Sequence, residues 1–499
     1  MTSAGEPRQQ AAKLNYRAVD LRFYNTLSRQ KEVFTPLHDG EVRMYHCGPT
    51  VYKRPHIGNY RAFLFADLLR RWFEANELKV TQVMNLTDVG HLTDDGDAGE
   101  DKLQQEAERT KVDPWAIVDE VSKAFFADLH ALGVVPAHHY PRATDHIPEM
   151  VELIEVLLEK GHAYRVGDNI YFDVHSFPEY GKLSGNRVED LEAGARLEIN
   201  QEKRHPADFA LWKSDPHHLM KWKTVFGEDG FPGWHIECSA MARKYLGDQF
   251  DLHTGGEDNV FPHHECEIAQ SESALNGSFV SLWMHTRFLQ VDGGKMSKSL
   301  GNVYSIDDLI ERGFHPFDFR FLVQRGHYRT SLNFTWEALK GAAEARKSLQ
   351  DLWSRLAPEM GQLGSPSSAV ALAQAEAASA VAPFAQEFRE GLNDDLNTSK
   401  AVAALFGLRT AVLGADFPES DRVAAAALLS AADRILGLFP EAEDSADGLS
   451  DADIEALVQA RTAAKAAKDF AAADDLRDQL TAAGIVVEDT PQGAKWHRS

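Results

Sequence analysis

Thiol, imidazole and carboxylate side chains gather in three short segments of this 499-residue chain. One thiol, Cys47, ends an apolar run, and a second, Cys238, lies in the segment 232–239. The third segment, 261–267, contains His263, His264, Glu265, Cys266 and Glu267. Zn²⁺ typically takes four ligands of these types. If the third segment is helical, positions 263 and 267 lie one turn apart and can face one ion, and 263 and 266 serve nearly as well.

The two cysteines also have a purely structural interpretation. Free cysteine is often buried as a small hydrophobic side chain. The spacing of the three segments matches no standard zinc-finger pattern. The residues alone therefore leave open both the metal site and the choice of its ligands.

Two further segments carry groups suited to binding phosphate. His56-Ile57-Gly58-Asn59 follows the apolar run 42–47 and opens a helical pattern. In such a strand–loop–helix layout, backbone N–H groups and the helix dipole attract phosphate. Lys295-Met296-Ser297-Lys298-Ser299 follows a strand-like run at 288–291, and its two cations can fold over a triphosphate. The first segment alone is an ordinary helix start, but the pair in this order is a specific signal.

The elements that must position these groups alternate between strand and helix over residues 20–135, and the same pattern resumes at residue 249 and runs to the lysine segment. The runs 42–47 and 79–86 read as buried strands. A helix is predicted from residue 56 onward by apolar residues at three- and four-residue spacing, namely Tyr60, Phe63, Leu64, Leu68 and Trp72. This alternation predicts a parallel sheet wrapped by helices, an α/β fold that binds ligands at the carboxyl ends of its strands.

The rest of the chain divides by composition. An irregular stretch at about 140–235, with short strands such as 169–174, predicts an insertion into the α/β domain. Beyond about residue 335 strand signals vanish, and Ala-rich helices predict a helical bundle over 336–440. An acidic linker then precedes a small C-terminal domain, 450–499, in which 484–489 reads as one arm of a hairpin. Residues 1–19 form an N-terminal extension.

Composition narrows the class of protein. No apolar stretch approaches the roughly 20 residues of a membrane span, and the N-terminus lacks the apolar centre of a secretory signal. Three cysteines make no disulfide framework and suit a reducing compartment, so we expect a cytoplasmic protein without a membrane partner.

The net charge of −24 argues at first against a nucleic-acid partner. From Arg461 to the C-terminus, however, six Lys/Arg residues balance six Asp/Glu residues, so the tail is neutral. Arg461, Lys465 and Lys468 share one face of a helix. That face is either a phosphate-contacting stripe or a solvated surface, and these three residues alone favour the solvated surface.

Taken together, the motifs resemble those of a known family. The segments at 56–59 and 295–299 resemble the HIGH and KMSKS signatures of class I aminoacyl-tRNA synthetases. With Cys47-Gly48-Pro49-Thr50-Val51-Tyr52, the segment 232–239 and the segment 261–265, the chain from about residue 22 onward is similar to cysteinyl-tRNA synthetase. The resemblance implies a Rossmann-type catalytic domain with an insertion, followed by a helical bundle on the anticodon side and a small anticodon-recognition domain.

The resemblance also implies roles for particular residues. It assigns one Zn²⁺ to Cys47, Cys238, His263 and Glu267, and the cysteine pocket to Thr50, Thr87, Trp234 and His253. ATP, with Mg²⁺, would meet His56, Ile57, Gly58, Asn59, Lys295, Met296, Ser297, Lys298 and Ser299, with His56, Asn59, Lys295 and Lys298 acting in catalysis. We expect Asp474, Arg477, Asp489 and Trp496 to contact tRNA. Asn59 departs from the signature, which has His there, and Cys266 stands where the family more often has Asn.

The resemblance predicts an ATP-dependent ligase. It forms cysteinyl-adenylate and passes cysteine to the terminal adenosine of tRNA(Cys), with zinc selecting the substrate thiolate. We expect a monomer. Two alternatives are a cysteine:amino-sugar ligase of thiol-cofactor biosynthesis and a non-catalytic, zinc-dependent RNA-binding protein. The helical region from Asp395-Leu396-Asn397-Thr398 and the tail 484–496 argue against the first, and both nucleotide motifs argue against the second.

Overall fold

In the computed structural model the chain divides into two compact units, Met1–Phe439 and Pro440–Ser499. The described residues are 20–90, 102–188, 202–275, 277–296, 301–440, 451–466, 473, 476–477, 479–480, 485–490 and 493–498. No helix among them is long and apolar enough to cross a membrane.

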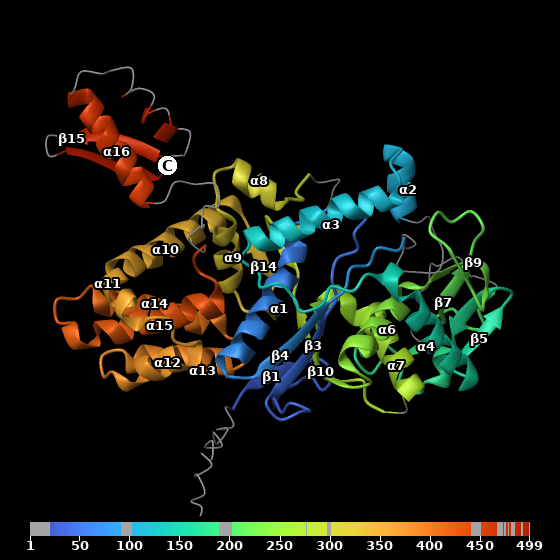
Figure 1. Cartoon of the computed structure of the whole chain (residues 1–499). Coiled ribbons are helices and arrows are strands. Elements are labelled where there is room, and N and C mark those ends of the chain that lie inside the picture. Colours follow the sequence, from blue (N-terminus) through green and yellow to red (C-terminus); the bar gives the residue numbers. More distant parts are fainter. Residues whose placement is uncertain are drawn as a thin grey trace, which may run out of the picture. The chain divides into compact units, whose positions relative to one another are not determined.

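A four-stranded parallel sheet forms the centre of the first unit (Figure 1). Its strands are β3 (Glu41–His46), β4 (Lys79–Met84), β10 (Phe250–Gly256) and β11 (Val280–Thr286), in the order β11-β10-β3-β4. β3 pairs with β4 over its whole length and with β10 through Met44, Tyr45 and His46. The predicted α/β fold is confirmed. The second strand ends at Met84, two residues earlier than the sequence predicted.

Helices cover both faces of this sheet because its strands are apolar on both sides. Successive side chains of β3 point to opposite faces. Val42 and Met44 belong to one buried cluster with α1 (Ile57–Ala75), and Tyr45 belongs to another with α6 (Trp234–Leu246) and α7 (Glu265–Leu275). All five apolar residues that predicted α1 are buried. The sheet thus separates two cores, and its carboxyl edge lies between the starts of α1 and α7.

An antiparallel five-stranded sheet occupies the predicted insertion. Its order is β5-β6-β7-β9-β8, built from β5 (Ala163–Val166), β6 (Asn169–Phe172), β7 (Phe209–Ser214), β8 (Trp222–Thr224) and β9 (Gly227–Pro232). β6 ends at Phe172 and not at residue 174, because Asp173 caps a short helical turn there. β9 leads through Gly233 directly into α6, so the insertion returns the chain to the central sheet beside Cys238.

Short elements surround the second phosphate-suited segment. β12 (Leu289–Val291) pairs with β13 (Gly294–Lys295) and with β14 (Leu332–Phe334). Between them lie α8 (Ile306–Glu311) and α9 (Pro316–Gln324). A separate hairpin, β1 (Arg22–Asn25) with β2 (Gln30–Val33), precedes the sheet. The sequence predicted β12, as the strand-like run 288–291, but it did not predict the two partner strands of β12 or the hairpin.

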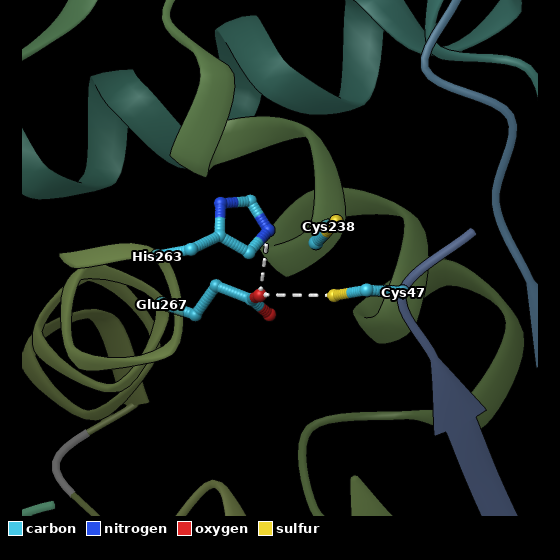
Figure 2. A group of neighbouring side chains, drawn as sticks. All are labelled: Cys47, Cys238, His263 and Glu267. Atoms are coloured by element: carbon cyan, nitrogen blue, oxygen red, sulfur yellow. Dashed lines mark hydrogen bonds and ion pairs between the residues drawn. The ribbon is translucent and has the colours of Figure 1, made fainter. Parts of the chain in front are cut away.

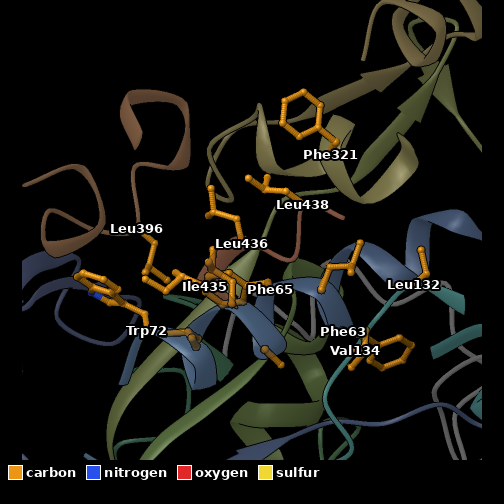
Figure 3. Packing of buried hydrophobic residues seen from close by; sticks show 14 of the residues in the cluster. Phe63, Phe65, Trp72, Leu132, Val134, Phe321, Leu396, Ile435, Leu436 and Leu438 are labelled. Carbon is orange, nitrogen blue, oxygen red and sulfur yellow. The ribbon is translucent and has the colours of Figure 1, made fainter. Parts of the chain in front are cut away.

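The remaining helices of the first unit fall into two groups. α2 (Lys102–Thr110) and α3 (Pro114–Ala131) lie between β4 and the predicted insertion, and α4 (Ile147–Glu159) lies within the insertion, ahead of its sheet. The predicted helical region contains α10 (Trp336–Arg355), α11 (Ala357–Leu363), α12 (Ser368–Ala377), α13 (Ala382–Asn393), α14 (Thr398–Val412) and α15 (Arg422–Leu436). Figure 3 shows Ile435 and Leu436 of α15 packed near Phe65 of α1.

A buried ion pair joins α1 to α9, and hydrogen bonds extend this contact to the end of α15. The Arg320 guanidinium contacts the Asp67 carboxylate at 2.5 Å, and both side chains are fully buried. Arg320 also donates to the carbonyl oxygen of Leu436 at 2.8 Å, and Arg71 donates to that of Arg434 at 2.7 Å. The end of α15 is therefore held directly on the helix that begins at the first phosphate-suited segment.

The second unit contains α16 (Asp451–Ala466) and a hairpin of β15 (Ile485–Thr490) and β16 (Gly493–Arg498). Ile454, Val458, Leu480 and Ile485 form its small core. The predicted hairpin arm is β15. Arg461 is buried, so the expectation that it lies on a solvated face is wrong, because its long side chain packs into the unit.

Candidate metal centre and nucleotide site

Four potential metal ligands meet at the carboxyl end of β3 (Figure 2). Cys47 follows the last residue of β3, Cys238 lies in α6, His263 lies in the turn before α7, and Glu267 lies in the first turn of α7. One donor atom from each lies within 4.8 Å of all the others. His263 and Glu267 face the same point, as their spacing of one helical turn predicted, since His263 Nε2 and Glu267 Oε1 are 3.1 Å apart. Cys238, His263 and Glu267 are buried.

The backbone beside Cys238 is tightly constrained. Gly233 precedes α6, and a Cβ atom on it would lie 2.0 Å from the carbonyl oxygen of Ala210. Only glycine allows β9 to pass so close to β7 before the chain enters α6. This close approach fixes where the first turns of α6, and with them Cys238, meet the end of β3.

The electrostatics of the four residues favour a cation among them. Burial alone would lower the pKa of His263, but Cys238 and Glu267 outweigh burial and raise that pKa to about 10. Burial alone would raise the pKa of Glu267, but His253 and His263 outweigh it and lower that pKa to about 2. The chain thus stabilises a positive charge against its thiols and carboxylate, which is what a metal ion would supply.

A second set of four donors overlaps the first. It combines Cys47 and Glu267 with His253 and His264. His264 Nε2 lies 3.2 Å from Cys47 Sγ, and His253 Nε2 lies 3.0 Å from Glu267 Oε2. Burial holds the pKa of His264 well below its ordinary value, with neighbouring histidines adding to the effect. His264 therefore stays neutral, and the geometry alone permits either set.

Cys266 belongs to neither set. Its side chain is buried, and Sγ lies 3.4 Å from the hydroxyl oxygen of Tyr180. The two sulfurs with metal-ligating neighbours are those of Cys47 and Cys238. The third thiol is thus one residue from Glu267 in sequence but occupies a different environment.

The residues expected to form a cysteine pocket lie around this cluster. Thr50 and Thr87 pair across the loops that follow β3 and β4. The Thr87 hydroxyl donates to Glu237 Oε2 at 3.1 Å, so it is tied to α6 beside Cys238. The Trp234 ring lies 4.4 Å from that of His263, centroid to centroid. His253 contacts Glu267 and orients it, a positioning role that the sequence did not predict.

The first phosphate-suited segment begins α1. His56 is the N-cap, and its backbone N–H donates to Asn59 Oδ1 at 3.0 Å. Burial lowers the pKa of His56, so its imidazole is neutral. Asn59 is exposed. The asparagine that replaces the expected histidine thus caps the helix with its oxygen, and among the described residues its amide nitrogen has no hydrogen-bond acceptor.

The second segment approaches the first. The Ile57 N–H donates to the carbonyl oxygen of Tyr304 at 2.9 Å. A Cβ atom on Gly58 would lie 2.2 Å from the methyl carbon of Met296, so Met296 packs on the bare backbone of Gly58. Lys295 is exposed. Ser297, Lys298 and Ser299 lie outside the described residues, but both ends of their loop are anchored beside the start of α1.

The residues expected to contact tRNA belong to the second unit. Arg477 is exposed. Trp496 is half-buried against the small core, and its indole N–H donates to Glu455 Oε2 at 3.0 Å. Asp489 pairs with Ala494 in the hairpin, and its side chain lies outside the described residues, as does the whole of Asp474.

Comparison with known proteins agrees with this arrangement. Residues 33–344 match the tRNA synthetases class I (C) catalytic domain, 387–440 the DALR domain, and 447–496 the cysteinyl-tRNA ligase anticodon binding domain. Among solved structures, Mycobacterium tuberculosis methionyl-tRNA synthetase in complex with methionyl-adenylate shares the fold. Its TM-score is 0.53 at 16% identity, covering 80% of this chain and 90% of that chain.

Curated relatives match over nearly the whole chain. The cysteine--tRNA ligase of Chlorobium chlorochromatii is 43% identical over 489 residues, covering 95% of this chain and 99% of the relative. A cysteine--tRNA ligase of Thermus thermophilus is 44% identical over 483 residues, with coverages of 95% and 99%. By its catalytic-domain match and these full-length relatives, this chain belongs to the cysteine--tRNA ligase family of class I aminoacyl-tRNA synthetases.

Proposed function

We propose that this protein is a cysteine--tRNA ligase. It joins cysteine to ATP as cysteinyl-adenylate with release of pyrophosphate, and then transfers cysteine to the 3′-terminal adenosine of tRNA(Cys). The observation that carries the proposal is the cluster of two thiols, an imidazole and a carboxylate at the carboxyl end of β3. Open α/β sheets bind their ligands at this edge.

The metal of this cluster is proposed to be one Zn²⁺ held by Cys47, Cys238, His263 and Glu267. The first donor set is preferred to the second because it offers two thiols, and thiolate ligands favour zinc. Bound zinc would coordinate the substrate sulfur as thiolate, which serine cannot provide at neutral pH. A cavity alone separates near-isosteric substrates by only about 1–3 kcal/mol, so sulfur chemistry supplies the selectivity that shape lacks.

The chain's own residues would orient the cysteine. Thr50 and Thr87 lie on paired loops, and the Trp234 ring lies beside that of His263, so these side chains can border the amino acid. His253 would hold the Glu267 carboxylate in place. Their fixed positions hold the substrate carboxylate where it can attack the α-phosphate of ATP.

ATP is proposed to bind across the start of α1 and the lysine loop. His56 and the free amide of Asn59 would donate to phosphate oxygens, assisted by the N–H groups of the first turn of α1. Lys295 and Lys298, with Mg²⁺ brought by ATP, would neutralise the charge that develops on the departing pyrophosphate. No protein nucleophile is needed.

The second unit is proposed to read the anticodon of tRNA(Cys), with Asp474, Arg477, Asp489 and Trp496 as candidate contacts. The exposed Arg477 suits a phosphate or a base edge. We further propose a catalytic domain over 20–335, a bundle over 336–440 and an anticodon domain over 450–499. We also propose that the protein is a monomer and that it works in the cytoplasm.

Cysteine-dependent ATP–pyrophosphate exchange, followed by aminoacylation of tRNA(Cys), tests the function. We expect exchange with cysteine and not with serine, and charging of tRNA(Cys). Exchange without charging, together with ligation of cysteine to an amino sugar, would support the amino-sugar ligase instead. Absence of exchange from a zinc-loaded preparation that still binds RNA would overturn the proposal in favour of a non-catalytic protein.

A further inference from the structure

Arg54, two residues before His56, connects the start of α1 with two other helices. Its Nε donates to Asp128 Oδ2 in α3 at 2.9 Å, and the hydroxyl of Tyr60 in α1 donates to the same oxygen at 2.6 Å. On its other side, Arg54 Nη2 donates to Asp307 Oδ1 in α8 at 3.0 Å, and Nη1 donates to the second oxygen of Asp307. We call Arg54, Asp128 and Asp307 the Arg54 bridge.

The α3 end of the Arg54 bridge is fixed within the core. The Asp128 side chain is only 4% exposed. α3 packs on α1 through Phe125, whose ring lies 5.2 Å from that of Phe63, centroid to centroid. Because Asp128 is anchored in this way, it holds the Arg54 guanidinium in one place relative to α1.

The α8 end of the Arg54 bridge lies just after the lysine loop. Asp307 is the second residue of this short helix. Three residues earlier, the carbonyl oxygen of Tyr304 accepts from the backbone N–H of Ile57 at 2.9 Å. The other end of the loop packs on Gly58. The lysine loop is therefore held at both ends beside the start of α1, and Arg54 supplies a side-chain contact at its exit.

The positive charge of Arg54 is already used by its two carboxylate partners. All three guanidinium nitrogens donate to oxygens of Asp128 or Asp307, so one cation faces two anions. Little of its hydrogen-bonding capacity is left for the phosphate oxygens of ATP. The place of Arg54 beside the proposed nucleotide site thus indicates that it orients other groups and does not itself bind ATP.

We propose that Arg54 is a positioning residue for formation of the adenylate. It would hold α8, and with it the exit of the lysine loop, against the start of α1, so that Lys295 and Lys298 reach the departing pyrophosphate. This inference rests on the proposed function and adds a residue that lies in neither phosphate-suited segment. Because the Asp307 side chain is 54% exposed, salt should screen the contact between Arg54 and α8.

Cysteine-dependent pyrophosphate exchange, measured over a range of cysteine concentrations, tests this role. The variants are Asp307→Asn and Asp307→Glu, which leave the pair of Arg54 with Asp128 intact, and Arg54→Lys. A lysine keeps the charge but lacks the planar fork that contacts both carboxylates. Glu41→Gln is the matched control, because Glu41 is also an exposed carboxylate in an ion pair, at the opposite, amino end of the sheet.

The expected result is a loss of rate without a loss of cysteine binding. Asp307→Asn and Arg54→Lys should lower kcat by about tenfold while KM for cysteine stays unchanged, because the misplaced loop acts only as pyrophosphate departs. Asp307→Glu should recover part of the rate, and Glu41→Gln should match the unmodified protein.

Salt dependence and metal content separate this role from a merely structural one. Bound zinc and melting temperature should be the same in Asp307→Asn as in the unmodified protein. The ratio of their kcat values should narrow toward one at about 0.5 M salt, where the exposed ion pair is screened. An unchanged kcat in Asp307→Asn, a ratio that salt does not alter, or a parallel rise in KM for cysteine would overturn the inference. Failure of the proposed function is recognised separately, because the unmodified protein would then show no cysteine-dependent exchange.

Discussion

Glu267 connects the metal cluster to the histidines behind it. One carboxylate oxygen faces His263, and the other accepts from His253. Both imidazoles stabilise the ionised carboxylate, which is the form that binds a metal ion. At the scale of single residues, the site is therefore prepared for a cation before any ligand arrives.

The ligand assignment can be tested with two cysteines of similar burial. Cys238→Ser should lower bound zinc from about one per chain and weaken metal affinity by about 100-fold or more, because a thiolate ligand is lost. Cysteine-dependent pyrophosphate exchange should fall with it. Metal analysis and exchange assays measure the two effects.

Cys266→Ser is the matched control. Its sulfur faces Tyr180 and lies in neither donor set, so zinc content and exchange should remain near normal. Full zinc retention and full discrimination against serine in the Cys238→Ser variant would show that Cys238 is not a ligand. Zinc loss in the control would instead point to a ligand arrangement that includes Cys266.

Only part of the metal site could be predicted from the sequence. The donor types and the helical spacing of His263 and Glu267 could be predicted from the segment itself. The competing donor set could not be predicted, because His264 reaches Cys47, and His253 reaches Glu267, only once the chain folds and brings distant segments together. The cap formed by Asn59 was also missed, since a side-chain oxygen that satisfies a backbone N–H is invisible in residue spacing.

At the scale of elements, the first turn of α1 meets the lysine loop through Gly58. Gly58→Ala would place a methyl group where the end of the Met296 side chain now lies and only 3.0 Å from Cε1 of His56, so Met296 must turn away and the His56 imidazole must shift. We expect pyrophosphate exchange to fall by about tenfold to 100-fold, because small misplacements of reacting groups are costly. Steady-state kinetics should show the loss at saturating cysteine.

Gly341→Ala provides the comparison for this change. Gly341 lies in α10, and a Cβ there would meet nothing within 4 Å, so its activity should be unchanged. Its stability should rise by about 0.5–1 kcal/mol, the usual gain of alanine over glycine inside a helix. Normal exchange in Gly58→Ala would mean that the contact between α1 and the loop does not govern catalysis.

Elements differed in how well the sequence predicted them. α1 was predicted because its buried residues from Tyr60 to Trp72 repeat with the period of a helix over about three turns. β12 was predicted from its apolar run, but the hairpin β1–β2 and the strands β13 and β14 were missed, because strands of two to four residues show no period of their own. They exist through pairing with distant segments, as β12 does with β14.

At the scale of the whole first unit, the Asp67–Arg320 pair should link stability to pH. Burial alone would raise the pKa of Asp67, but Arg320 and Arg71 outweigh it and hold the pKa below its ordinary value. The stabilisation is therefore fully present above about pH 4 and is lost as pH falls through the folded-state pKa. Asp67→Asn should cost about 3–5 kcal/mol at neutral pH by leaving Arg320 buried without a counterion.

Thermal unfolding of both proteins from neutral pH to about pH 3 measures this effect. The stability difference between the unmodified protein and Asp67→Asn should narrow in the acid range, as Asp67 becomes protonated. Asp168→Asn, at an exposed carboxylate paired with Arg165, should change stability by at most about 1 kcal/mol at every pH. A constant difference across the range would contradict the assignment.

The division into two units predicts separable functions. Ending the chain at Phe439 removes the second unit and leaves the metal cluster, α1 and the lysine loop intact. Cysteine-dependent pyrophosphate exchange should remain near normal, while aminoacylation of tRNA(Cys) should fall by about tenfold or more. Equal charging by the shortened and full-length proteins would mean that the second unit does not read the anticodon.

The strand order of the central sheet has a consequence for how the protein is made. β3 lies between β4, which follows it closely in sequence, and β10, which is more than 200 residues away. While the chain leaves the ribosome, β3 can pair with β4, but the other edge of β3 stays unpaired until β10 has been synthesised. Exposed strand edges invite wrong pairing, and distant pairings form slowly. The interval between residues 84 and 250 is therefore when the nascent chain has most need of a chaperone.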